Sequence, residues 1–243
     1  MRLPRQDTMV SLSAEAPALA LARDAALLDE IGVTPLVRWY TLTAPAVVLG
    51  LALHHRRAQV INEERCRAAG IQVLERSAGG GAVLLDVGGV LCCSVCIPDP
   101  HADLTESYRW LGAHFARRLG LRRVAVDEAR RDVAMLRERA DAVAALVLNT
   151  CYGALSPHEV VNAAGAKVVG MAQVRRRHAA LFQVGILLRD QSALADLLHV
   201  PDEAHRVQLR VELTRRSAGL EWQADLPQLV QRLALDEALQ PPR

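Results

Sequence analysis

The pattern of hydrophobic and polar positions along the chain predicts short strands in adjacent pairs, with amphipathic helices between them. Predicted strands span residues 37–42, 46–49, 71–74, 82–85, 90–97, 160–164, 167–174 and 180–188. Predicted helices span residues 17–31, 62–69, 104–119 and 128–138, with further helical patterns near 191–199, 203–213 and 227–239. Because the strands run in adjacent pairs and the helices are spaced irregularly, we expect an α+β fold with a mixed sheet flanked by helices, not a regular β-α-β alternation.

Composition and charge narrow the class of protein. The chain has 243 residues, 51% of them hydrophobic, which is enough for one large domain with a full core. Lys+Arg total 29 against 27 Asp+Glu, and a formal net charge of +2 argues against a partner held mainly by charge, such as nucleic acid. No apolar stretch reaches the roughly 20 residues that a membrane helix needs. We therefore expect neither nucleic-acid nor membrane partners.

The cysteines indicate a reducing environment and no metal site. There are five, an odd number without the spacing of a secreted disulfide scaffold, which favours a cytoplasmic location. Cys92, Cys93 and Cys96 lie in one apolar run, and no second pair of ligands stands near them. We expect these three to be buried as small hydrophobic residues, with no metal bound.

The basic residues are unevenly divided. Of the 29, 28 are arginine and one is lysine, Lys167. Arginine replaces lysine readily on a surface, but its planar fork cannot replace a compact ammonium on a flexible stem. We therefore expect chemistry at Lys167, although composition alone is also compatible with its survival by chance.

A glycine-rich turn joins two predicted strands. Residues 76–83 read Arg-Ser-Ala-Gly-Gly-Gly-Ala-Val. Consecutive glycines let the backbone approach a ligand closely, and their N–H groups can meet an anion or a carbonyl. The spacing fits neither a dinucleotide fingerprint nor a Walker loop. Taken alone, a flexible hairpin turn is the simpler interpretation.

A second motif changes that balance. Residues 166–173 read Ala-Lys-Val-Val-Gly-Met-Ala-Gln, and residues 183–188 form the next predicted strand. Together with the glycine turn, and with Asp86 after it, these segments resemble the catalytic domain shared by lipoate–protein ligases, octanoyltransferases and, more remotely, biotin–protein ligases. The family's motifs are similar to Arg-Arg-x-Ser/Thr-Gly-Gly-Gly-Ala-Val and Arg-Lys-(Val/Ile)-x-Gly-x-Ala-Gln. The resemblance runs from about residue 37 to residue 188.

The resemblance implies a fold and a set of roles. The fold is the mixed sheet of class II tRNA synthetases and biotin–protein ligases, here as a catalytic domain over residues 1–190 with a helical extension over 191–243 packed on it. Lys167 would hydrogen-bond an acyl carbonyl and stabilise its oxyanion. Arg76 would bind the phosphate of an acyl-adenylate. Asp86 would hold the glycine loop in place or help to bind a metal or a nucleotide. The residues assigned to acyl binding are Gly79, Gly80, Gly81, Ala82, Gly170 and Gly185.

The reaction mode stays open between two enzymes and a binding module. An ATP-dependent ligase, our first expectation, would use ATP and Mg²⁺ to attach lipoate or octanoate to a lipoyl-domain lysine through an acyl-adenylate. A transferase would need no cofactor and would pass the acyl group from an acyl carrier protein through a Cys151 thioester. In this second case, residues 151–159 resemble the Cys-aromatic-x-x-Pro/Ser…Glu stretch of the cysteine-dependent octanoyltransferases. The expected partners are lipoyl-domain proteins such as 2-oxoacid dehydrogenase E2 or glycine cleavage H protein.

Two departures from the family pattern leave a non-catalytic acyl-binding paralogue open. Glu75 stands where the family has the first arginine of a pair, and Val184 stands where it has a histidine. The run of residues 175–178, Arg-Arg-Arg-His, fits an acidic partner or a phosphate as well as it fits a solvated turn.

Overall fold

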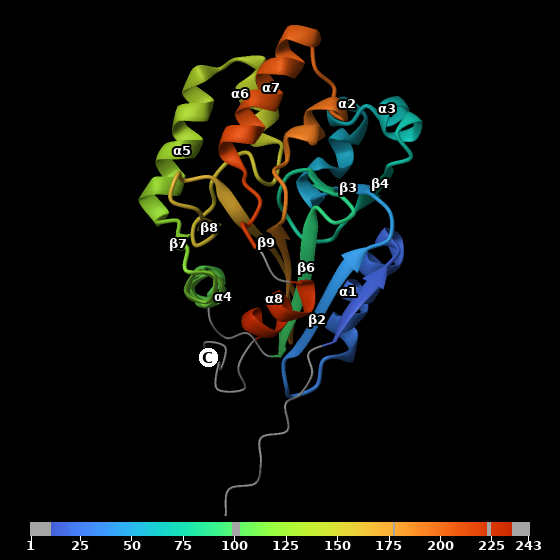
Figure 1. Ribbon diagram of the computed structural model, residues 1–243, viewed down its shortest axis with the longest axis vertical. Helices are drawn as coiled ribbons and strands as arrows, with labels where there is room; N and C mark the ends of the chain where they lie inside the picture. Colours follow the sequence, from blue (N-terminus) through green and yellow to red (C-terminus); the bar gives the residue numbers. More distant parts are fainter. Residues whose placement is uncertain (1–10, 99–102, 177, 223–224, 235–243) are drawn as a thin grey trace, which may run out of the picture.

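A computed structural model describes residues 11–98, 103–176, 178–222 and 225–234, and a seven-stranded mixed sheet forms its centre (Figure 1). The strand order is β1-β2-β6-β10-β9-β8-β7. β1 and β2 pair in parallel, and the other described neighbours pair antiparallel. The strands are β1 (Leu12–Glu15), β2 (Leu36–Leu42), β6 (Val90–Pro98), β7 (Arg122–Arg123), β8 (Val160–Val161), β9 (Lys167–Arg176) and β10 (Ala179–Leu187). The predicted α+β fold with a mixed sheet is confirmed.

A second, three-stranded sheet carries the glycine turn. Its order is β4-β3-β5, with β3 parallel to β4 and antiparallel to β5. The strands are β3 (Ala46–Leu49), β4 (Gln72–Glu75) and β5 (Val83–Leu85). The glycine turn therefore connects β4 and β5, on either side of the central strand β3.

Helices cover the sheets on both faces (Figure 1). The α-helices are α1 (Pro17–Glu30), α2 (Arg57–Val60), α3 (Glu63–Ala68), α4 (Leu104–Leu119), α5 (Val126–Arg139), α6 (Ala142–Leu148), α7 (Glu203–Arg216) and α8 (Leu226–Leu233), and the 3₁₀ segments are η1 (Leu51–Arg56) and η2 (Ser192–Asp196). Strand alternation sends neighbouring side chains to opposite faces. Trp39 of β2 packs with Phe115 of α4, whereas Tyr40 packs with Ala20 of α1.

Short polar residues set several helix boundaries. The side chain of Asp103 accepts a hydrogen bond from the backbone N–H of Glu106 at the start of α4, and Asp141, Asp202 and Asp225 cap α6, α7 and α8 in the same way. Gly120 ends α4 with a φ of +69°.

The C-terminal segment joins two hydrophobic clusters. Leu209 and Leu213 of α7 pack with α6, η2 and the three-stranded sheet, while Leu229 and Leu233 of α8 pack with α4 and the central sheet. A domain boundary at residue 190 stays a prediction. The helix predicted near 227–239 corresponds to α8, and its part beyond residue 234 lies outside the described residues.

Two predicted elements are shorter than expected. The strand predicted over 160–164 ends at Val161, because the Asn162 side chain accepts hydrogen bonds from the N–H groups of Ala164 and Ala166 and forms a turn. The helix predicted near 191–199 is the 3₁₀ segment η2.

Candidate active site

Lys167, the single lysine, is the first residue of β9 and is fully buried. Its Nζ lies 2.5 Å from Oε2 of Glu159. The same ammonium donates hydrogen bonds to the backbone carbonyls of Cys151, at 2.8 Å, and Ala154, at 2.5 Å. An ammonium has three N–H donors, so these partners occupy all of them. In the structure Lys167 holds the chain around Cys151, and its contact with an acyl carbonyl stays a prediction.

Glu159, the partner of Lys167, is 2% exposed. Its carboxylate also accepts hydrogen bonds from the backbone N–H groups of Ser156, at 2.9 Å, and Met171, at 3.3 Å. Burial raises the pKa of this carboxyl, and the Lys167 ammonium acts in the opposite direction. A buried ion pair is tolerated where its remaining polar atoms are hydrogen-bonded, as they are here.

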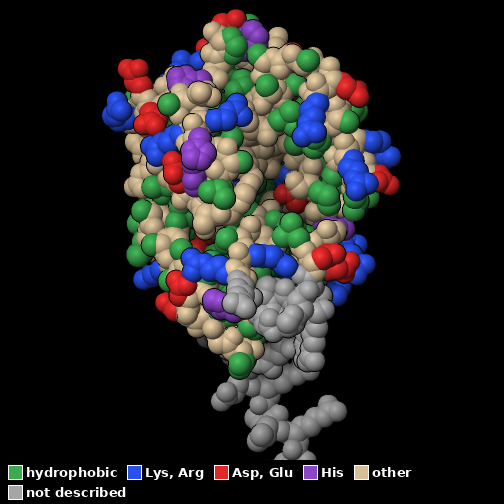
Figure 2. Space-filling view, turned by 180° about the vertical axis from the view of Figure 1, so that it is seen from behind, with side chains coloured by type: hydrophobic (Ala, Val, Ile, Leu, Met, Phe, Trp, Pro, Cys, Tyr) green, Lys and Arg blue, Asp and Glu red, His purple; other side chains and the backbone are tan. Residues whose placement is uncertain are grey.

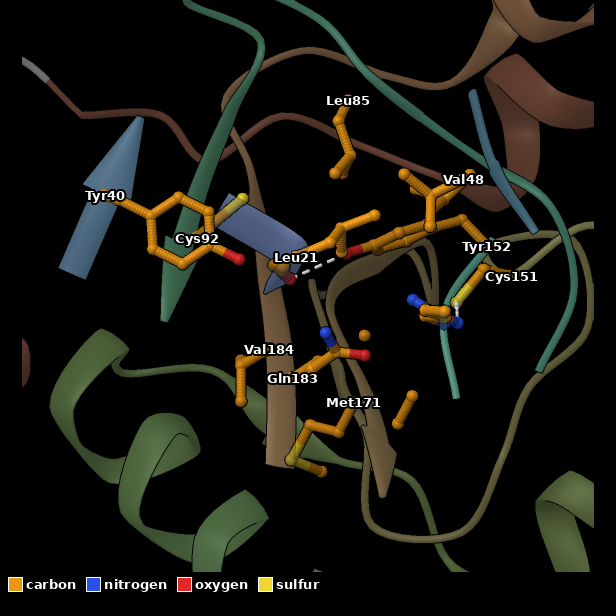
Figure 3. Close-up of a pocket in the computed structure, with 15 residues that line it drawn as sticks. Leu21, Tyr40, Val48, Leu85, Cys92, Cys151, Tyr152, Met171, Gln183 and Val184 are labelled. Atoms are coloured by element: carbon orange, nitrogen blue, oxygen red, sulfur yellow. Dashed lines mark hydrogen bonds between the residues drawn. The ribbon is translucent and has the colours of Figure 1, made fainter. Parts of the chain in front are cut away.

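The thiol of Cys151 is half-buried at the edge of the cavity drawn in Figure 3. The guanidinium of Arg76 lies beside it. Nη2 of Arg76 is 3.8 Å from Sγ, and it donates to the backbone carbonyl of Gly79 at 3.1 Å. The guanidinium therefore places a positive charge directly beside the sulfur, where a thiolate, the nucleophilic form of cysteine, would face it. Arg76 was predicted to bind a phosphate. In this structure its guanidinium contacts Sγ of Cys151.

The other four cysteines are buried. Burial raises the pKa of Cys92 to about 12 and that of Cys96 to about 11, and it also raises the pKa values of Cys66 and Cys93. These four thiols therefore stay protonated near neutral pH. The protonated state of Cys92 matters most, because Cys92 lines the same cavity as Cys151. As a thiol, Cys92 does not compete with Cys151 as a nucleophile.

The glycine turn packs against the segment that carries Cys151. The N–H of Ala82 donates to the carbonyl of Asn149, and the N–H of Cys151 donates to the carbonyl of Ala82, each at 2.8 Å. A Cβ at position 81 would lie 2.5 Å from the carbonyl oxygen of Asn149, so Gly81 permits this close approach. Gly80 has a φ of +99°, which L side chains rarely adopt. The turn therefore fixes the Cys151 segment, and the acyl-binding role given to its residues stays a prediction.

Tyr152, the next residue, is anchored on two glycines of the central sheet. Gly170 of β9 and Gly185 of β10 are register partners, and the Tyr152 side chain occupies the space beside both. A Cβ at Gly170 would lie 2.8 Å from Cζ of the ring, and one at Gly185 would lie 2.5 Å from the hydroxyl oxygen. These glycines, predicted to contact the acyl group, do line the cavity beside Cys151, and they also make room for Tyr152.

A narrow cavity of about 30 Å³ opens beside Cys151 (Figure 3). Its apolar lining includes Leu21 of α1, Val48 of β3, Met171 of β9 and Val184 of β10. Ligand pockets usually measure about 300 Å³ or more. An acyl chain therefore enters only if flexible side chains in this lining move aside.

The side chain of Gln183, which lines this cavity, is held in place by Asp24. Nε2 of Gln183 donates to Oδ2 of Asp24 at 2.9 Å. Asp24 also accepts hydrogen bonds from the hydroxyls of Tyr40, at 3.0 Å, and Ser94, at 2.5 Å. In the part of the chain that the structure describes, Oε1 of Gln183 has no hydrogen-bond partner. The amide nitrogen of Gln183 is thus fixed by Asp24, while its amide oxygen stays unpaired within the described residues.

A second and more open cavity, of about 590 Å³, shares Met171 and Ala172 with the first and reaches Gly79 and Gly80. Gln173, which also lines it, is 9% exposed. Among the described residues, neither its amide oxygen nor its amide nitrogen has a hydrogen-bond partner. Since buried polar groups are normally paired, this amide is available to a bound molecule.

Asp86 and Glu75 do not gather beside Cys151. Oδ2 of Asp86 lies 3.0 Å from Nη1 of Arg189 at the turn after β5, and Asp86 lines neither of the two cavities described above. Glu75 lies 3.5 Å from Nδ1 of His54 and 3.6 Å from Nη1 of Arg57. Of the residues predicted to meet phosphate, metal or nucleotide, only Arg76 stands at the site.

The arginine run after β9 is partly engaged within the fold. Nη2 of Arg175 donates to Oγ of Ser107 at 2.7 Å, Arg176 pairs with Asp29, and Arg177 lies outside the described residues. On the face drawn in Figure 2, arginine side chains lie interspersed with acidic ones. Within the run, Arg175 and Arg176 are therefore each engaged by a partner in the fold.

Among the described residues there is neither a metal-binding cluster nor a membrane-spanning helix. Over the described residues, no group of three or more His, Cys, Asp or Glu side chains is arranged to hold a metal ion. No helix in the same residues is long and apolar enough to cross a membrane.

The fold and this site agree with a comparison to known families. Residues 16–233 match the model of the lipoyl protein ligase A/B catalytic domain. The chain therefore belongs to that family, and it is an enzyme of lipoyl or octanoyl attachment to proteins. This confirms the family resemblance seen in the glycine and lysine motifs.

Particular relatives include both kinds of enzyme. The octanoyltransferase LipM of Exiguobacterium sibiricum is 29% identical over 213 residues, which cover 84% of this chain and 74% of the relative. LipM of Carboxydothermus hydrogenoformans is 27% identical over 207 residues, covering 82% and 72%. Among solved structures, the bipartite lipoate protein ligase of Thermoplasma acidophilum, studied with its E2 lipoyl domain, has a TM-score of 0.70 at 22% identity, covering 91% of this chain and 79% of that one. A lipoate–protein ligase A bound with ATP has a TM-score of 0.65 at 21% identity, covering 91% and 81%. At these identities the structural likeness shows the fold.

Three residues of the site carried no role in the sequence analysis: Glu159, Tyr152 and Gln183. Glu159 and Tyr152 lie in the stretch that resembles the cysteine-dependent octanoyltransferases, which was the available signal. Their burial against Lys167 and against paired glycines depends on the pairing of β9 with its neighbours, which sequence spacing does not reveal.

Proposed function

We propose that this chain is a cysteine-dependent acyltransferase that carries an octanoyl or lipoyl group on Cys151 and delivers it to a lysine of a lipoyl domain. The observation that carries the proposal is the position of the Cys151 thiol. It lies 3.8 Å from the Arg76 guanidinium, and it borders a narrow apolar cavity. The LipM octanoyltransferases among its relatives support the same assignment.

The first half-reaction forms a thioester on Cys151. The thiolate, stabilised by Arg76, attacks the carbonyl carbon of a thioester donor. A new C–S bond forms to Cys151, the donor's C–S bond breaks, and the leaving thiolate takes up the proton that Cys151 lost. The acyl tail occupies the narrow cavity, where Leu21 and Met171 have the rotamer freedom to move aside.

The second half-reaction moves the acyl group to the acceptor. The neutral amine of the acceptor lysine attacks the Cys151 thioester, a C–N bond forms, and the C–S bond breaks. The proton lost by the amine restores the Cys151 thiol. The donor's thiol leaves through the larger cavity, of about 590 Å³, and the acceptor's amine enters through it. The amide of Gln173, which lines that cavity, is available to form hydrogen bonds with either group.

The partners follow from these steps. The donor is an acyl carrier protein loaded with octanoate or lipoate, and the acceptor is a lipoyl domain of a 2-oxoacid dehydrogenase E2 or a glycine cleavage H protein. The structural neighbour studied with its E2 lipoyl domain supports the acceptor class. A cytoplasmic location belongs to the same proposal.

An ATP-dependent ligase is the second candidate. The Gly79-Gly80-Gly81 turn followed by Asp86 resembles the motif of the ATP-dependent ligases, whereas the cysteine-dependent transferases often carry arginine at the third glycine position. In that mode Arg76 would meet the phosphate of an acyl-adenylate, and ATP with Mg²⁺ would supply the activation. The residues fit this poorly, since Glu75 replaces an arginine and Asp86 pairs with Arg189 away from both cavities.

A two-donor assay tests the choice. The protein and an apo-lipoyl domain are incubated either with octanoyl-acyl carrier protein or with free octanoate, ATP and Mg²⁺, and the acceptor is weighed by mass spectrometry. We expect octanoylation from the carrier alone, lost in Cys151→Ser. Octanoylation from free octanoate that needs ATP and survives Cys151→Ser would establish the ligase instead. No modification with either donor would indicate the binding paralogue.

A further inference from the structure

We propose that Glu159 is a positioning residue for Cys151 that acts through Lys167. The inference rests on the function proposed above, because it concerns the thiol that carries the acyl group. Over the described residues, no hydrogen bond joins Glu159 to the thiol itself. Its carboxylate binds the ammonium that holds the backbone on both sides of Tyr152.

The contacts form a short relay. Oε2 of Glu159 lies 2.5 Å from Nζ of Lys167, and Nζ donates to the carbonyls of Cys151 and Ala154 at 2.8 and 2.5 Å. One ammonium therefore joins two points of the same loop, three residues apart. This arrangement fixes the loop's curvature and, with it, the direction in which the Cys151 side chain leaves the backbone.

Glu159 supplies the negative charge that faces this buried ammonium. Among the described residues it is the one carboxylate in an ion pair with Nζ of Lys167, and the other two acceptors are neutral backbone carbonyls. Removing one member of a buried ion pair leaves the other charge uncompensated, which favours a rearrangement of the charged side chain. Without the carboxylate, the Lys167 ammonium is therefore held less firmly against the two loop carbonyls.

The carboxylate is itself held in place. The backbone N–H groups of Ser156 and Met171 donate to its two oxygens. The preceding residue, His158, has a φ of +69°, a conformation that is uncommon for a residue with a side chain. The chain therefore turns sharply just before Glu159 and places its carboxylate beneath the Cys151 loop, not at the surface.

This relay explains why one lysine survives in a chain that otherwise uses arginine. Three acceptors converge on the single Nζ atom, within 2.5–2.8 Å. A guanidinium spreads its donors over a planar fork and cannot direct them to one point. Arginine at position 167 would satisfy fewer of these acceptors while adding volume to a fully buried site.

The test separates positioning from stability. Full-length protein is mixed with excess octanoyl-acyl carrier protein without acceptor, quenched at intervals and weighed, which gives both the rate and the final fraction of acylated chains. A positioning role lowers the rate at an unchanged final fraction. A purely structural role lowers the final fraction with the folded fraction, which the thermal unfolding midpoint reports.

The variants are Glu159→Gln, Glu159→Asp, Lys167→Met and the double variant that combines Glu159→Gln with Lys167→Met. We expect Glu159→Gln to acylate about tenfold to a hundredfold more slowly. Glu159→Asp, which keeps the charge on a shorter stem, should fall between it and wild type. The double variant should be no slower than Lys167→Met alone, because Glu159 acts only through Lys167. Glu15→Gln is the matched control, since Glu15 is a buried carboxylate paired with Arg23 and Arg38.

Three results would overturn the inference. Wild-type rates in Glu159→Gln would show that the relay is not needed, and a loss of final fraction at an unchanged rate would show a role in stability alone. A double variant slower than Lys167→Met by the full Glu159→Gln factor would show that the two residues act independently. If wild type forms no acyl-Cys151 and instead needs ATP, the proposed function has failed, which is a different outcome from any of these.

Discussion

The hydroxyl of Tyr152 donates a hydrogen bond to the backbone carbonyl of Gly185, at 2.7 Å. This contact ties the residue after Cys151 to the central sheet, while Lys167 holds the Cys151 carbonyl from the other side. The nucleophile therefore sits on a loop that is fixed at neighbouring positions. Precise placement of a reacting group is worth a large share of a catalytic rate, so substitutions that disturb either anchor should slow acylation.

Gly185→Ala tests the Tyr152 anchor. The new Cβ would lie 2.5 Å from the Tyr152 hydroxyl oxygen, so the ring must move. We expect a loss of about 1–3 kcal/mol in the free energy of unfolding and at least a tenfold lower rate of Cys151 acylation. Denaturant unfolding and acyl-enzyme mass spectrometry measure the two effects. Gly32→Ala is the control, because nothing lies within 4 Å of a Cβ there. Equal behaviour of the two variants would contradict the account.

Arg76→Met tests the charge beside the thiol. Without the guanidinium the thiolate loses its neighbouring positive charge, so we expect acylation at neutral pH to slow by about tenfold. Arg76→Lys should retain part of the rate, since it keeps the charge without the fork. Acylation reactions quenched at intervals give the rate. Arg122→Met is the control, because Arg122 forms a surface ion pair with Glu128. A wild-type rate in Arg76→Met would remove Arg76 from the mechanism.

Leu21→Trp tests whether the narrow cavity takes the acyl tail. Leu21 lines the cavity from α1, and a larger side chain there leaves less room. We expect the variant to prefer a butanoyl donor over an octanoyl donor, relative to wild type, by tenfold or more in acylation rate. Leu21→Ala should shift the preference toward longer chains. An unchanged chain-length profile in both variants would mean that the tail binds elsewhere.

The stability of the protein should fall in acid because of Glu212. Burial alone would raise the pKa of Glu212, but hydrogen bonds from Arg215, Arg139 and Arg216 outweigh it and lower the pKa from 4.5 to about 2. A lowered pKa in the folded state stabilises the fold above pH 4.5, and this contribution disappears as the pH falls toward 2. It amounts to about 2 kcal/mol after allowance for solvent screening.

Denaturant unfolding at a series of pH values measures this contribution. Glu212→Gln should lower the free energy of unfolding at neutral pH and flatten its decline between pH 4.5 and 2. Arg216 also donates to the carbonyl of Gly153 in the Cys151 loop, at 3.1 Å, so acylation should slow in the variant as well. The same acid slope in the variant as in wild type would show that Glu212 is not the responsible group.

Much of the fold could be predicted from the sequence where the apolar pattern was long. The strands predicted at 167–174 and 180–188 became β9 and β10 within two residues at each end, because both are long buried runs. β7 was missed because two residues carry no pattern, and β1 because its four residues mix small, polar and charged side chains. The helix α6 was missed for the opposite reason: Ala142–Leu148 is apolar at every position, so no helical period stands out.

Several residues of the candidate site could be predicted from the sequence, but their contacts could not. Lys167, Cys151 and the glycine turn carry recognisable residue types and spacing, so the sequence could nominate them. The sequence could not show that Lys167 points at backbone carbonyls, since that depends on where the Cys151 loop passes over β9. Nor could it show that the glycines serve close contacts within the protein, with Asn149 and Tyr152, as well as a surface for a ligand.

The central claim is that Cys151 carries the acyl group, and trapping the acyl-enzyme tests it most directly. Wild-type protein is incubated with octanoyl-acyl carrier protein without acceptor, then digested and mapped by mass spectrometry. We predict one octanoyl group per chain, located on Cys151, released by hydroxylamine and transferred to an apo-lipoyl domain added afterwards. Octanoylation of the lipoyl domain by the Cys151→Ser variant at the wild-type rate, with no acyl group found on Cys151 of wild type, would contradict the account.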